Sequence, residues 1–312
     1  MKKFFNHISI FFLVLIIVGY GLEPVIDYGL HSLEGSVYAE WQDLVNGKIN
    51  TDLIVMGSSR GVVSYDAMMI EKELGISSFN LSFNAGSYNL QQAKMNAYLI
   101  SNKVPTVIFQ NIDLAHLSKS EVIPFEQQFI TSINSSNYLE IDKRLSGSLK
   151  DFRFKGISKY SIDSRRLKLS ILNLLCLEPN YLRKTKGYHS VDKSYKPDTY
   201  NLARLNNSAS VDMIYGLEET IKYYQQERFN NTVVYIIWAP EYEVRRKLNE
   251  ELAQSVKEII KSKIIGIENI KFIDLRNDEI GDDLKNYYDS FHLNATGSKI
   301  FTKKLISQFK QF

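Results

Sequence analysis

Five short apolar runs alternate with amphipathic segments along most of this chain, and this alternation is the strongest constraint on its fold. The runs are rich in β-branched and aromatic residues, and most are followed by apolar residues that recur at helical spacing. Strands that alternate with helices usually pair in parallel, because the helical crossover returns the chain to the same end of the sheet. We therefore expect an α/β fold, a three-layer sandwich around a five-stranded parallel sheet. The runs cover residues 52–56, 78–83, 105–112, 232–238 and 270–275.

The intervals between the runs carry helix signals. The first interval stops at Gly75, and glycine is the residue that most often terminates a helix. In the last segment, Ile300, Phe301 and Leu305 recur at helical spacing, and Asn294 just before it is a good helix cap. The predicted helices cover residues 65–74, 90–101, 211–229, 241–265 and 295–309.

Residues 118–205 interrupt the alternation. They show no clear succession of strands and helices, and they are rich in Lys, Arg, Tyr and Ser. One apolar piece with helical spacing, at 170–177, includes the single cysteine of the chain. We predict a helical insertion, or lid, in the α/β domain. A glycan-binding surface made by its tyrosines and arginines is a compatible and more specific interpretation.

The N-terminal segment has a different composition from the rest. The 19 residues from Phe4 to Leu22 include no Asp, Glu, Lys or Arg. As a helix they would span about 28 Å, close to the thickness of the hydrocarbon core of a bilayer. Lys2 and Lys3 precede this stretch, which favours a cytoplasmic N-terminus. The stretch therefore predicts a transmembrane helix.

This topology predicts a single-pass protein of the cell membrane whose catalytic domain is extracytoplasmic. A cleaved signal peptide is one alternative, for which Gly19-Tyr20-Gly21 is a poor cleavage site. A buried helix of a soluble protein is the other. The predicted organisation is an anchor at residues 1–22, a stalk at 23–50, and the α/β domain with its insertion at 51–312.

The composition argues against several classes of protein. Lysine and arginine total 38 against 35 aspartates and glutamates, and a formal charge of +3 gives no sign of a nucleic-acid partner. The single cysteine, Cys176, excludes a disulfide framework and a multi-cysteine metal site. We expect no metal and no cofactor. We also expect Cys176 to be a buried packing residue, so that the nucleophile is a hydroxyl.

Candidate catalytic side chains follow the apolar runs, at the strand ends where open parallel sheets bind ligands. Ser58 and Ser59 follow the first run, next to Gly57. A nucleophilic serine needs a base, and a histidine held by a carboxylate is the usual choice. Asp289 lies three residues before His292 and just before the last predicted helix, so one short loop can supply both groups.

Each of these residues has a simpler interpretation. The two serines could merely cap the helix that follows them, and Asp289 could be an acid near a helix N-terminus. Arg60 could bind an anionic substrate, although an ion-paired or solvated arginine is the commoner case. His116, which follows the third run and has Asp113 nearby, is the only other histidine placed to act as the base.

Gly57-Ser58-Ser59, Gly86 after the second run, and Asp289-x-x-His292 with Asn294 and Gly297 together resemble the motifs of the SGNH (GDSL-like) hydrolase superfamily. The resemblance covers roughly residues 50–115 and 230–312, and it implies the flavodoxin-like sheet expected above. Within that superfamily, the Gly-Ser-Ser form is similar to the D-alanyl-transfer protein of teichoic acid synthesis. It is also similar to membrane-anchored proteins of polysaccharide O-acylation.

The resemblance implies a role for each matching residue. Ser59 would be the nucleophile, His292 the general base and acid, and Asp289 the orienting carboxylate. The oxyanion hole would use the backbone N–H groups of Ser59 and Gly86, although Gly86 could instead only permit a turn with positive φ. The family's third block, Gly-x-Asn-Asp, is replaced by Gln-Asn-Ile-Asp at 110–113, so Asn111 is carried over only as a candidate donor.

These residues predict a serine enzyme that acts on acyl esters during O-acylation or deacylation of a cell-surface or secreted polysaccharide. The expected partners are that polysaccharide, the membrane and a membrane-bound acyl-donor protein. The alternative is a non-catalytic glycan-binding or scaffold protein of the same fold in a polysaccharide-modification complex. An intact Ser–His–Asp set favours the enzyme, and the altered third block favours the scaffold.

Overall fold

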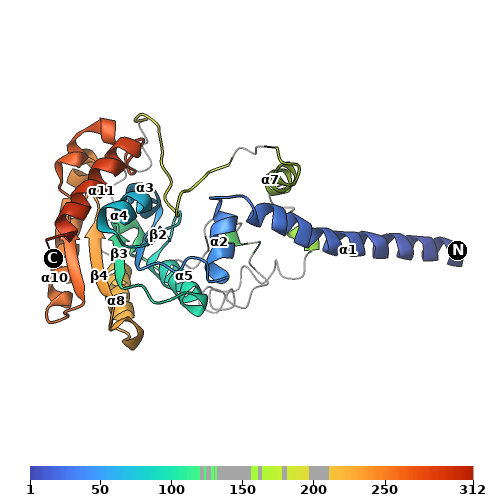
Figure 1. Ribbon diagram of the computed structural model, residues 1–312, viewed down its shortest axis with the longest axis horizontal. Coiled ribbons are helices and arrows are strands. Elements are labelled where there is room, and N and C mark those ends of the chain that lie inside the picture. Colours follow the sequence, from blue (N-terminus) through green and yellow to red (C-terminus); the bar gives the residue numbers. More distant parts are fainter. Residues whose placement is uncertain are drawn as a thin grey trace.

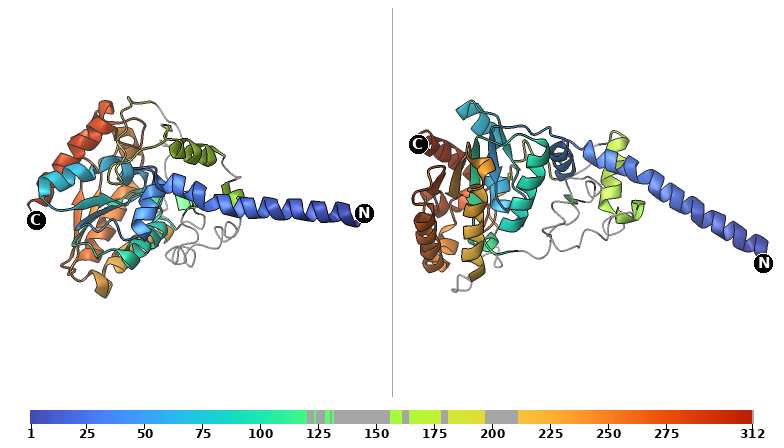
Figure 2. Two further views of the ribbon diagram at one scale, coloured as in Figure 1. Left: turned by 45° about the vertical axis from the view of Figure 1, so that its right-hand side comes forward. Right: turned by 90° about the horizontal axis from the view of Figure 1, so that it is seen from below.

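The computed structural model consists of an α/β body from which a long N-terminal helix projects (Figure 1). Two further views show the same helix extending away from the body (Figure 2). The structure describes residues 1–119, 123, 128–129, 131, 156–160, 164–177, 181–196 and 211–311.

A five-stranded parallel sheet forms the centre of the body, as predicted. Its spatial order is β2-β1-β3-β4-β5, and every neighbouring pair of strands is parallel. In the register of the central strands, Val55 lies between Asn80 and Phe109. The strands are β1 (Leu53–Met56), β2 (Ser78–Asn80), β3 (Val107–Ile112), β4 (Val233–Trp238) and β5 (Ile270–Asp274).

Helices cover both faces of the sheet and complete the predicted three layers. Side chains of a strand alternate between the two faces, so Ile54 and Met56 join one buried core and Leu53 and Val55 join the other. The first core is covered by α5 (Tyr88–Ser101), α8 (Val211–Tyr224) and α10 (Glu250–Ile264), and the second by α3 (Ser59–Ser64), α4 (Ala67–Leu74) and α11 (Ala295–Phe309).

The helix ends follow their local signals, but one predicted helix is divided in two. Gly75 has a φ of 70° and ends α4 as expected. Asn294 caps α11, as expected, by accepting two backbone N–H groups at 3.0 Å. The segment 241–265 forms α9 (Glu243–Leu248) and α10 instead of one helix. The break lies at Asn249, whose side-chain amide donates to the carbonyl of Arg245 at 3.0 Å.

The N-terminal helix α1 (Lys2–His31) is long and apolar enough to cross a membrane. Its most apolar window of 18 residues has a mean hydropathy of 2.2 and is not buried by the rest of the protein. A signal sequence meets the same criterion of length and composition. The helix continues beyond Leu22, and the predicted stalk, residues 23–50, contains its last turns and α2 (Val37–Val45).

Two helical pieces of the predicted insertion pack against the end of α1. They are η4 (Gly156–Tyr160) and α7 (Arg165–Leu174), and most of residues 118–205 lies outside the described residues. The buried ammonium of Lys159 pairs with the carboxylates of Glu23 at 2.7 Å and Asp27 at 2.8 Å, which are one turn apart on α1. These pieces therefore fix the junction between the helix and the body.

A buried ion cluster joins α2 to the body. Glu40 on α2 accepts hydrogen bonds from Lys94 on α5 at 2.5 Å and from Lys184 at 2.8 Å. Burial lowers the pKa of Lys94 to about 8, although the neighbouring Glu40 opposes this shift. Because the three side chains are buried, losing Glu40 would leave two buried ammonium groups without a counter-charge.

Cys176 is exposed, so the expectation of a buried packing residue is wrong. It lies just past the end of α7 with a φ of 55°, in the left-handed position that usually belongs to glycine. Its N–H donates to the Asn173 carbonyl at 3.0 Å, and the N–H of Leu177 donates to the Leu172 carbonyl at 2.9 Å. This is a Schellman turn, and it directs the cysteine away from the protein.

Candidate active site

The candidate site lies beyond the carboxyl ends of β1 and β3. From β1 the sheet continues to β2 on one side and to β3 on the other. At such a switch point the connecting chains diverge to opposite faces, which leaves a crevice beyond the strand ends. Ser58 and Ser59 directly follow β1, and Asn111 and Asp113 lie at the end of β3. The topology therefore brings the predicted groups of both strands together.

Ser59 begins α3 after a connection that requires glycine. A Cβ atom on Gly57 would lie 2.9 Å from Cβ of Asn111, so a larger residue would push β1 away from β3. Ser58 is the N-cap residue of α3 but makes no side-chain capping hydrogen bond, and it is fully buried. Ser59 is partly exposed. Of the two serines, Ser59 is therefore the one that a substrate can reach.

His292 connects Ser59 to Asp289. Its Nε2 atom lies 2.8 Å from Ser59 Oγ, and its Nδ1 atom lies 3.1 and 2.9 Å from the two carboxylate oxygens of Asp289. An ionised carboxylate only accepts hydrogen bonds, so Nδ1 carries the proton and Nε2 accepts one from the Ser59 hydroxyl. The three residues predicted as catalytic thus form one continuous hydrogen-bonded chain.

The loop that carries Asp289 also fixes its orientation and charge. Its Oδ1 atom accepts the backbone N–H groups of Phe291 at 2.8 Å and His292 at 2.7 Å. Burial raises the pKa of this carboxyl. The hydrogen bonds from His292 and from the two backbone N–H groups lower the pKa by more than burial raises it. The net shift is downward, so Asp289 is ionised at neutral pH and can hold the imidazole.

Aromatic rings restrict the movement of the imidazole. The ring of Tyr288 stacks parallel to His292 with centroids 5.3 Å apart, and the ring of Phe291 meets it edge-on at 4.8 Å. Contacts of this kind add packing energy in a defined geometry. The imidazole is therefore held by rings as well as by its hydrogen bonds.

A segment that forms neither helix nor strand, residues 184–196, lies against the same loop, and we call it the strap. At one end, the N–H of Lys184 donates to the Gly35 carbonyl at 2.8 Å, between α1 and α2. At the other end, the N–H of Lys196 donates to the Tyr288 carbonyl at 3.0 Å. The strap therefore links the connection between α1 and α2 to the loop that carries Asp289 and His292.

A second aspartate–histidine pair contacts Ser58, the serine next to Ser59. The Ser58 hydroxyl donates to Oδ2 of Asp113 at 2.5 Å, and Nδ1 of His116 lies 2.6 Å from Oδ1 of the same carboxylate. His116, the rival base in the sequence, is thus engaged with Asp113, the carboxylate that also accepts the Ser58 hydroxyl. The sequence held a signal for this pair, because Asp113-x-x-His116 has the same spacing as Asp289-x-x-His292.

The Asp113–His116 pair favours its charged form. Burial raises the pKa of the Asp113 carboxyl, but His116, Arg60 and the Ser58 hydroxyl outweigh burial and lower this pKa well below its usual range. Burial lowers the pKa of His116, but the adjacent Asp113 outweighs burial and the net shift is upward. The two shifts have the signs expected of a buried ion pair.

We expect this pair to make stability depend on pH. A histidine whose pKa is raised by folding stabilises the protein fully below its unfolded pKa of about 6.5 and loses this contribution as pH rises through the folded pKa. The contribution of this pair to the free energy of unfolding should therefore fall as pH rises above 6.5. Denaturant unfolding of the full chain at several pH values measures this fall. In His116→Gln the fall should be absent, and an unchanged profile would contradict the assignment.

Asn111 offers a buried donor near the nucleophile turn. Its Oδ1 atom accepts the Tyr65 hydroxyl at 2.8 Å, which fixes the orientation of the amide. Its Nδ2 atom is buried and has no hydrogen-bond partner among the described residues. That atom would lie 3.4 Å from a Cβ on Gly57. An unpaired buried donor costs about 1–3 kcal/mol, and such a cost in a native structure is often explained by function.

Gly86 has a different environment from the one expected. Its N–H donates to the Phe83 carbonyl at 3.2 Å within the turn after β2. The positive φ of this turn belongs to Ala85, at 54°, and not to Gly86. A Cβ atom on Gly86 would lie 3.0–3.2 Å from the ring of Phe83. Gly86 therefore allows close packing of the turn, and its oxyanion role stays a prediction.

Arg60 directly follows Ser59 and is buried in an ion cluster. Its guanidinium lies 3.3 Å from Glu241 Oε1 and donates to the Ala239 carbonyl at 2.9 Å. Arg276 donates to the other carboxylate oxygen of Glu241 at 3.0 Å. The ion-paired interpretation of Arg60 is thus the one observed. No local pattern pointed to Glu241 as this partner, since it lies 181 positions further along the chain.

Among the described residues, no group of three or more His, Cys, Asp or Glu side chains is arranged to hold a metal ion. No family model matches the sequence, and no curated protein matches it.

Several solved structures resemble the chain at low identity. One is an acetyl xylan esterase from the rumen bacterium Butyrivibrio proteoclasticus, with 12% identity and a TM-score of 0.38. Another is a family two carbohydrate esterase from Clostridium thermocellum, solved with cellohexaose, with 10% identity and a TM-score of 0.34. In both cases 83% of this chain is covered, and the chain spans only 63% of the other protein.

A third similar structure is a putative acylhydrolase from Bacteroides fragilis, with 10% identity and a TM-score of 0.39. The match covers 87% of this chain and 94% of that one. Similarities at this level do not assign an activity, so the chemistry must be derived from the site of this chain.

Proposed function

We propose that this protein is a serine enzyme that hydrolyses acyl esters of a polysaccharide, or transfers acyl groups to it, at the outer face of the cell membrane. The observation that carries the proposal is the contact chain from Ser59 Oγ through His292 to Asp289, with a serine–imidazole distance of 2.8 Å. A hydrogen bond of this length is what proton transfer from a nucleophile to its base requires.

The geometry supports a two-step reaction. Ser59 Oγ would attack the acyl carbonyl carbon while His292 Nε2 takes the hydroxyl proton. Asp289 would stabilise the imidazolium that forms. The tetrahedral intermediate then collapses, the ester C–O bond breaks, and His292 returns the proton to the departing alcohol. In the second step, water or a sugar hydroxyl attacks the acyl-Ser59 ester, with His292 again as the base.

The proposed location follows from α1. An uncleaved anchor with a cytoplasmic N-terminus would place the α/β body outside the cytoplasm, where surface or secreted polysaccharides occur. A membrane-bound acyl-donor protein is the proposed partner for transfer. The strap supports a link between membrane anchoring and catalysis. Its backbone makes hydrogen bonds to Gly35, beside α1, at one end and to Tyr288, in the catalytic loop, at the other.

Labelling with a fluorophosphonate tests the catalytic proposal without a known substrate. The native full-length chain should be labelled on Ser59, and Ser59→Ala should not be labelled. The matched control is Ser58→Ala in the same turn. That variant should still be labelled, because Ser58 is buried and bonded to Asp113. If the native chain is not labelled and a Ser59→Ala strain keeps full polysaccharide O-acylation, the protein is not the enzyme and the scaffold interpretation takes its place.

Asn111 should contribute to the rate if its free amide stabilises the oxyanion. Removing one oxyanion donor typically costs about 10²–10³-fold in rate. We expect Asn111→Ala to slow fluorophosphonate labelling of Ser59 by this factor. The control is Gln110→Ala on the same strand, whose side chain bonds Gln91 and Tyr224 at 2.7 Å. Equal labelling rates in the two folded variants would remove Asn111 from the oxyanion hole.

A further inference from the structure

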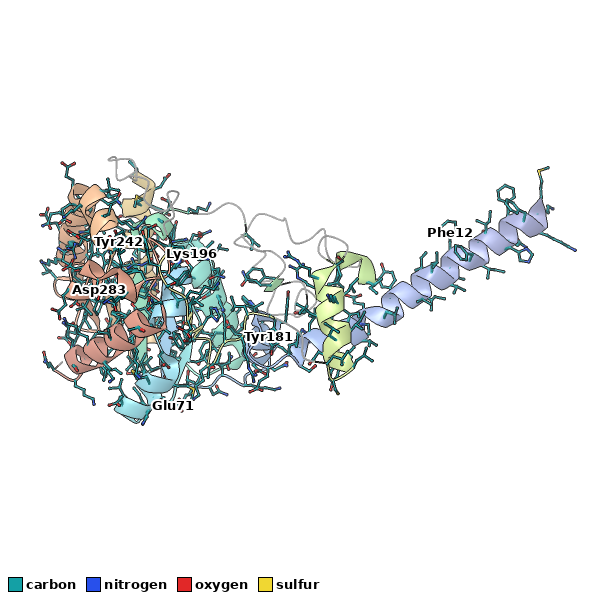
Figure 3. The ribbon with its side chains drawn as sticks, turned by 90° about the horizontal axis from the view of Figure 1, so that it is seen from above. Phe12, Glu71, Tyr181, Lys196, Tyr242 and Asp283 are labelled. Carbon is teal, nitrogen blue, oxygen red and sulfur yellow. The ribbon has the colours of Figure 1, made fainter. Side chains whose placement is uncertain are left out.

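Tyr65 directly follows α3, and its side chain is fully buried in the α/β body. Side chains of α1, such as Phe12, by contrast stand clear of that body (Figure 3). The backbone carbonyl of Tyr65 accepts the side-chain amide of Asn80, at the end of β2, at 3.1 Å. Its ring meets Phe301 of α11 edge-on, with centroids 5.0 Å apart. Contacts with β2 and α11 thus fix the position of the Tyr65 hydroxyl.

This hydroxyl holds one end of the Asn111 amide. Burial raises the pKa of Tyr65 well above its usual range, so the hydroxyl keeps its proton and can donate. It donates to Asn111 Oδ1 at 2.8 Å. Because Oδ1 and Nδ2 are the two ends of one planar group, Nδ2 then points away from Tyr65. That atom is buried without a partner among the described residues, and it lies 3.4 Å from where a Cβ atom of Gly57 would be.

The orientation of this amide decides what it offers to the turn at Gly57 and Ser59. The terminal torsion of an asparagine is broad and roughly two-fold, so the residue itself does not select one orientation. A flipped amide would present its oxygen to the turn, and an oxygen lone pair repels a developing oxyanion. Donors stabilise a transition state most when they are already oriented, because no reorganisation is then needed during the reaction. The Tyr65 hydroxyl therefore selects the orientation in which Asn111 can act as a donor.

We propose that Tyr65 is a positioning residue for the oxyanion hole. It holds the Asn111 amide with its N–H groups toward the oxyanion that forms when Ser59 attacks an ester. Tyr65 itself does not touch the substrate, because its side chain is fully buried and its hydroxyl is bonded to Asn111. This inference rests on the serine chemistry proposed above and on Asn111 as a donor in it.

Tyr65→Phe tests this role, because it removes the hydroxyl and keeps the ring against Phe301. The rate constant for fluorophosphonate labelling of Ser59 in the full chain should fall by about five- to tenfold, since the net strength of one neutral hydrogen bond corresponds to such a factor. In an Asn111→Ala background the same substitution should change the rate by less than about twofold, because no amide remains to be oriented. A purely structural role of Tyr65 would slow labelling in both backgrounds.

Tyr224→Phe is the matched control. The Tyr224 side chain is also buried, and its hydroxyl donates at 2.7 Å to Oε1 of Gln110, the residue before Asn111 on β3. Successive side chains of a strand point to opposite faces of the sheet, so Gln110 lies on the other face. Its Nε2 atom is bonded to Gln91 at 2.7 Å. Tyr224→Phe thus loses a comparable hydrogen bond, and it should label Ser59 at the native rate.

Hydrolysis of an activated acetyl ester gives a second measurement. Loss of an interaction that is made only in the transition state lowers kcat and leaves KM unchanged, so Tyr65→Phe should lower kcat alone. A native labelling rate in Tyr65→Phe, an equal loss in the Asn111→Ala background, an equal loss in Tyr224→Phe, or a change in KM alone would each overturn this inference and leave Ser59 as the nucleophile. Absence of labelling in the native chain would instead reject the proposed function, and this inference with it.

Discussion

Replacing His292 by alanine should slow the acylation of Ser59 by about 10²–10⁴-fold, the usual contribution of a positioned general base. The physical reason is the 2.8 Å contact between His292 Nε2 and Ser59 Oγ, without which the serine hydroxyl keeps its proton at neutral pH. The rate constant for fluorophosphonate labelling measures the effect directly. Hydrolysis of an activated acetyl ester provides a second measurement on the same variant.

His116 is the matched control for this substitution. It has the same residue type, the same spacing from an aspartate, and a place beside the same turn, but it contacts Asp113 and not Ser59. His116→Ala should therefore lower stability while the folded fraction keeps its labelling rate within about tenfold. A large rate loss in His116→Ala together with a normal rate in His292→Ala would reverse the assignment of the base.

Asp289→Asn should reduce the rate nearly as strongly as loss of the imidazole, because an amide can favour the wrong tautomer of His292. The double variant with His292→Ala should be little worse than either single variant, since residues that act as one unit have non-additive effects. Both backbone N–H groups of the loop, from Phe291 and His292, donate to Asp289 Oδ1, which asparagine retains. The loop should therefore be kept in this variant, and the change falls on Oδ2, which lies 2.9 Å from His292 Nδ1.

The sequence was sufficient to predict the sheet and the contact between Ser59, His292 and Asp289, because the motifs behind both are local patterns. Each strand is a short apolar run, and the alternation with helices fixes parallel pairing. The Asp289-x-x-His292 spacing placed both groups on one loop, and the turn after β1 placed Ser59 at the sheet edge. The order of the strands then brought these two segments together across 233 positions of the chain.

The features that the sequence did not predict depend on particular hydrogen bonds and ion pairs, which hydrophobic spacing does not reveal. The split of the predicted helix at 241–265 follows a side-chain bond at Asn249 that competes with the helix. Cys176 is exposed because it occupies a Schellman turn, which helical spacing of the apolar residues around it does not reveal. The sequence pattern predicted that Glu241 belongs to a helix with a charged face. In the structure it is buried between Arg60 and Arg276.

Replacing Glu241 by alanine should lower the free energy of unfolding by about 3–5 kcal/mol, the cost typical of breaking a buried ion pair. Its carboxylate is 1% exposed and lies between the guanidiniums of Arg60 and Arg276, at 3.3 and 3.0 Å. Without it, two buried cations would face each other with no charge between them. The Trp238 indole N–H, which lies 3.2 Å from Glu241 Oε1, would also lose its acceptor. Urea unfolding of the full chain in detergent measures the loss.

Glu250→Ala is the control that separates the effect of burial on stability from the effect of the distance to Arg276. Glu250 pairs with Arg276 at 2.5 Å, a shorter contact than that of Glu241, but its side chain is 50% exposed. Exposed pairs contribute only about 0–1 kcal/mol, so Glu250→Ala should have a small effect despite the shorter distance. Because Arg60 directly follows Ser59, Glu241→Ala should also slow fluorophosphonate labelling in the fraction that remains folded. Similar losses of stability in the two variants would contradict the role given to burial, and an unchanged labelling rate in Glu241→Ala would show that the ion cluster does not hold the turn at Ser59.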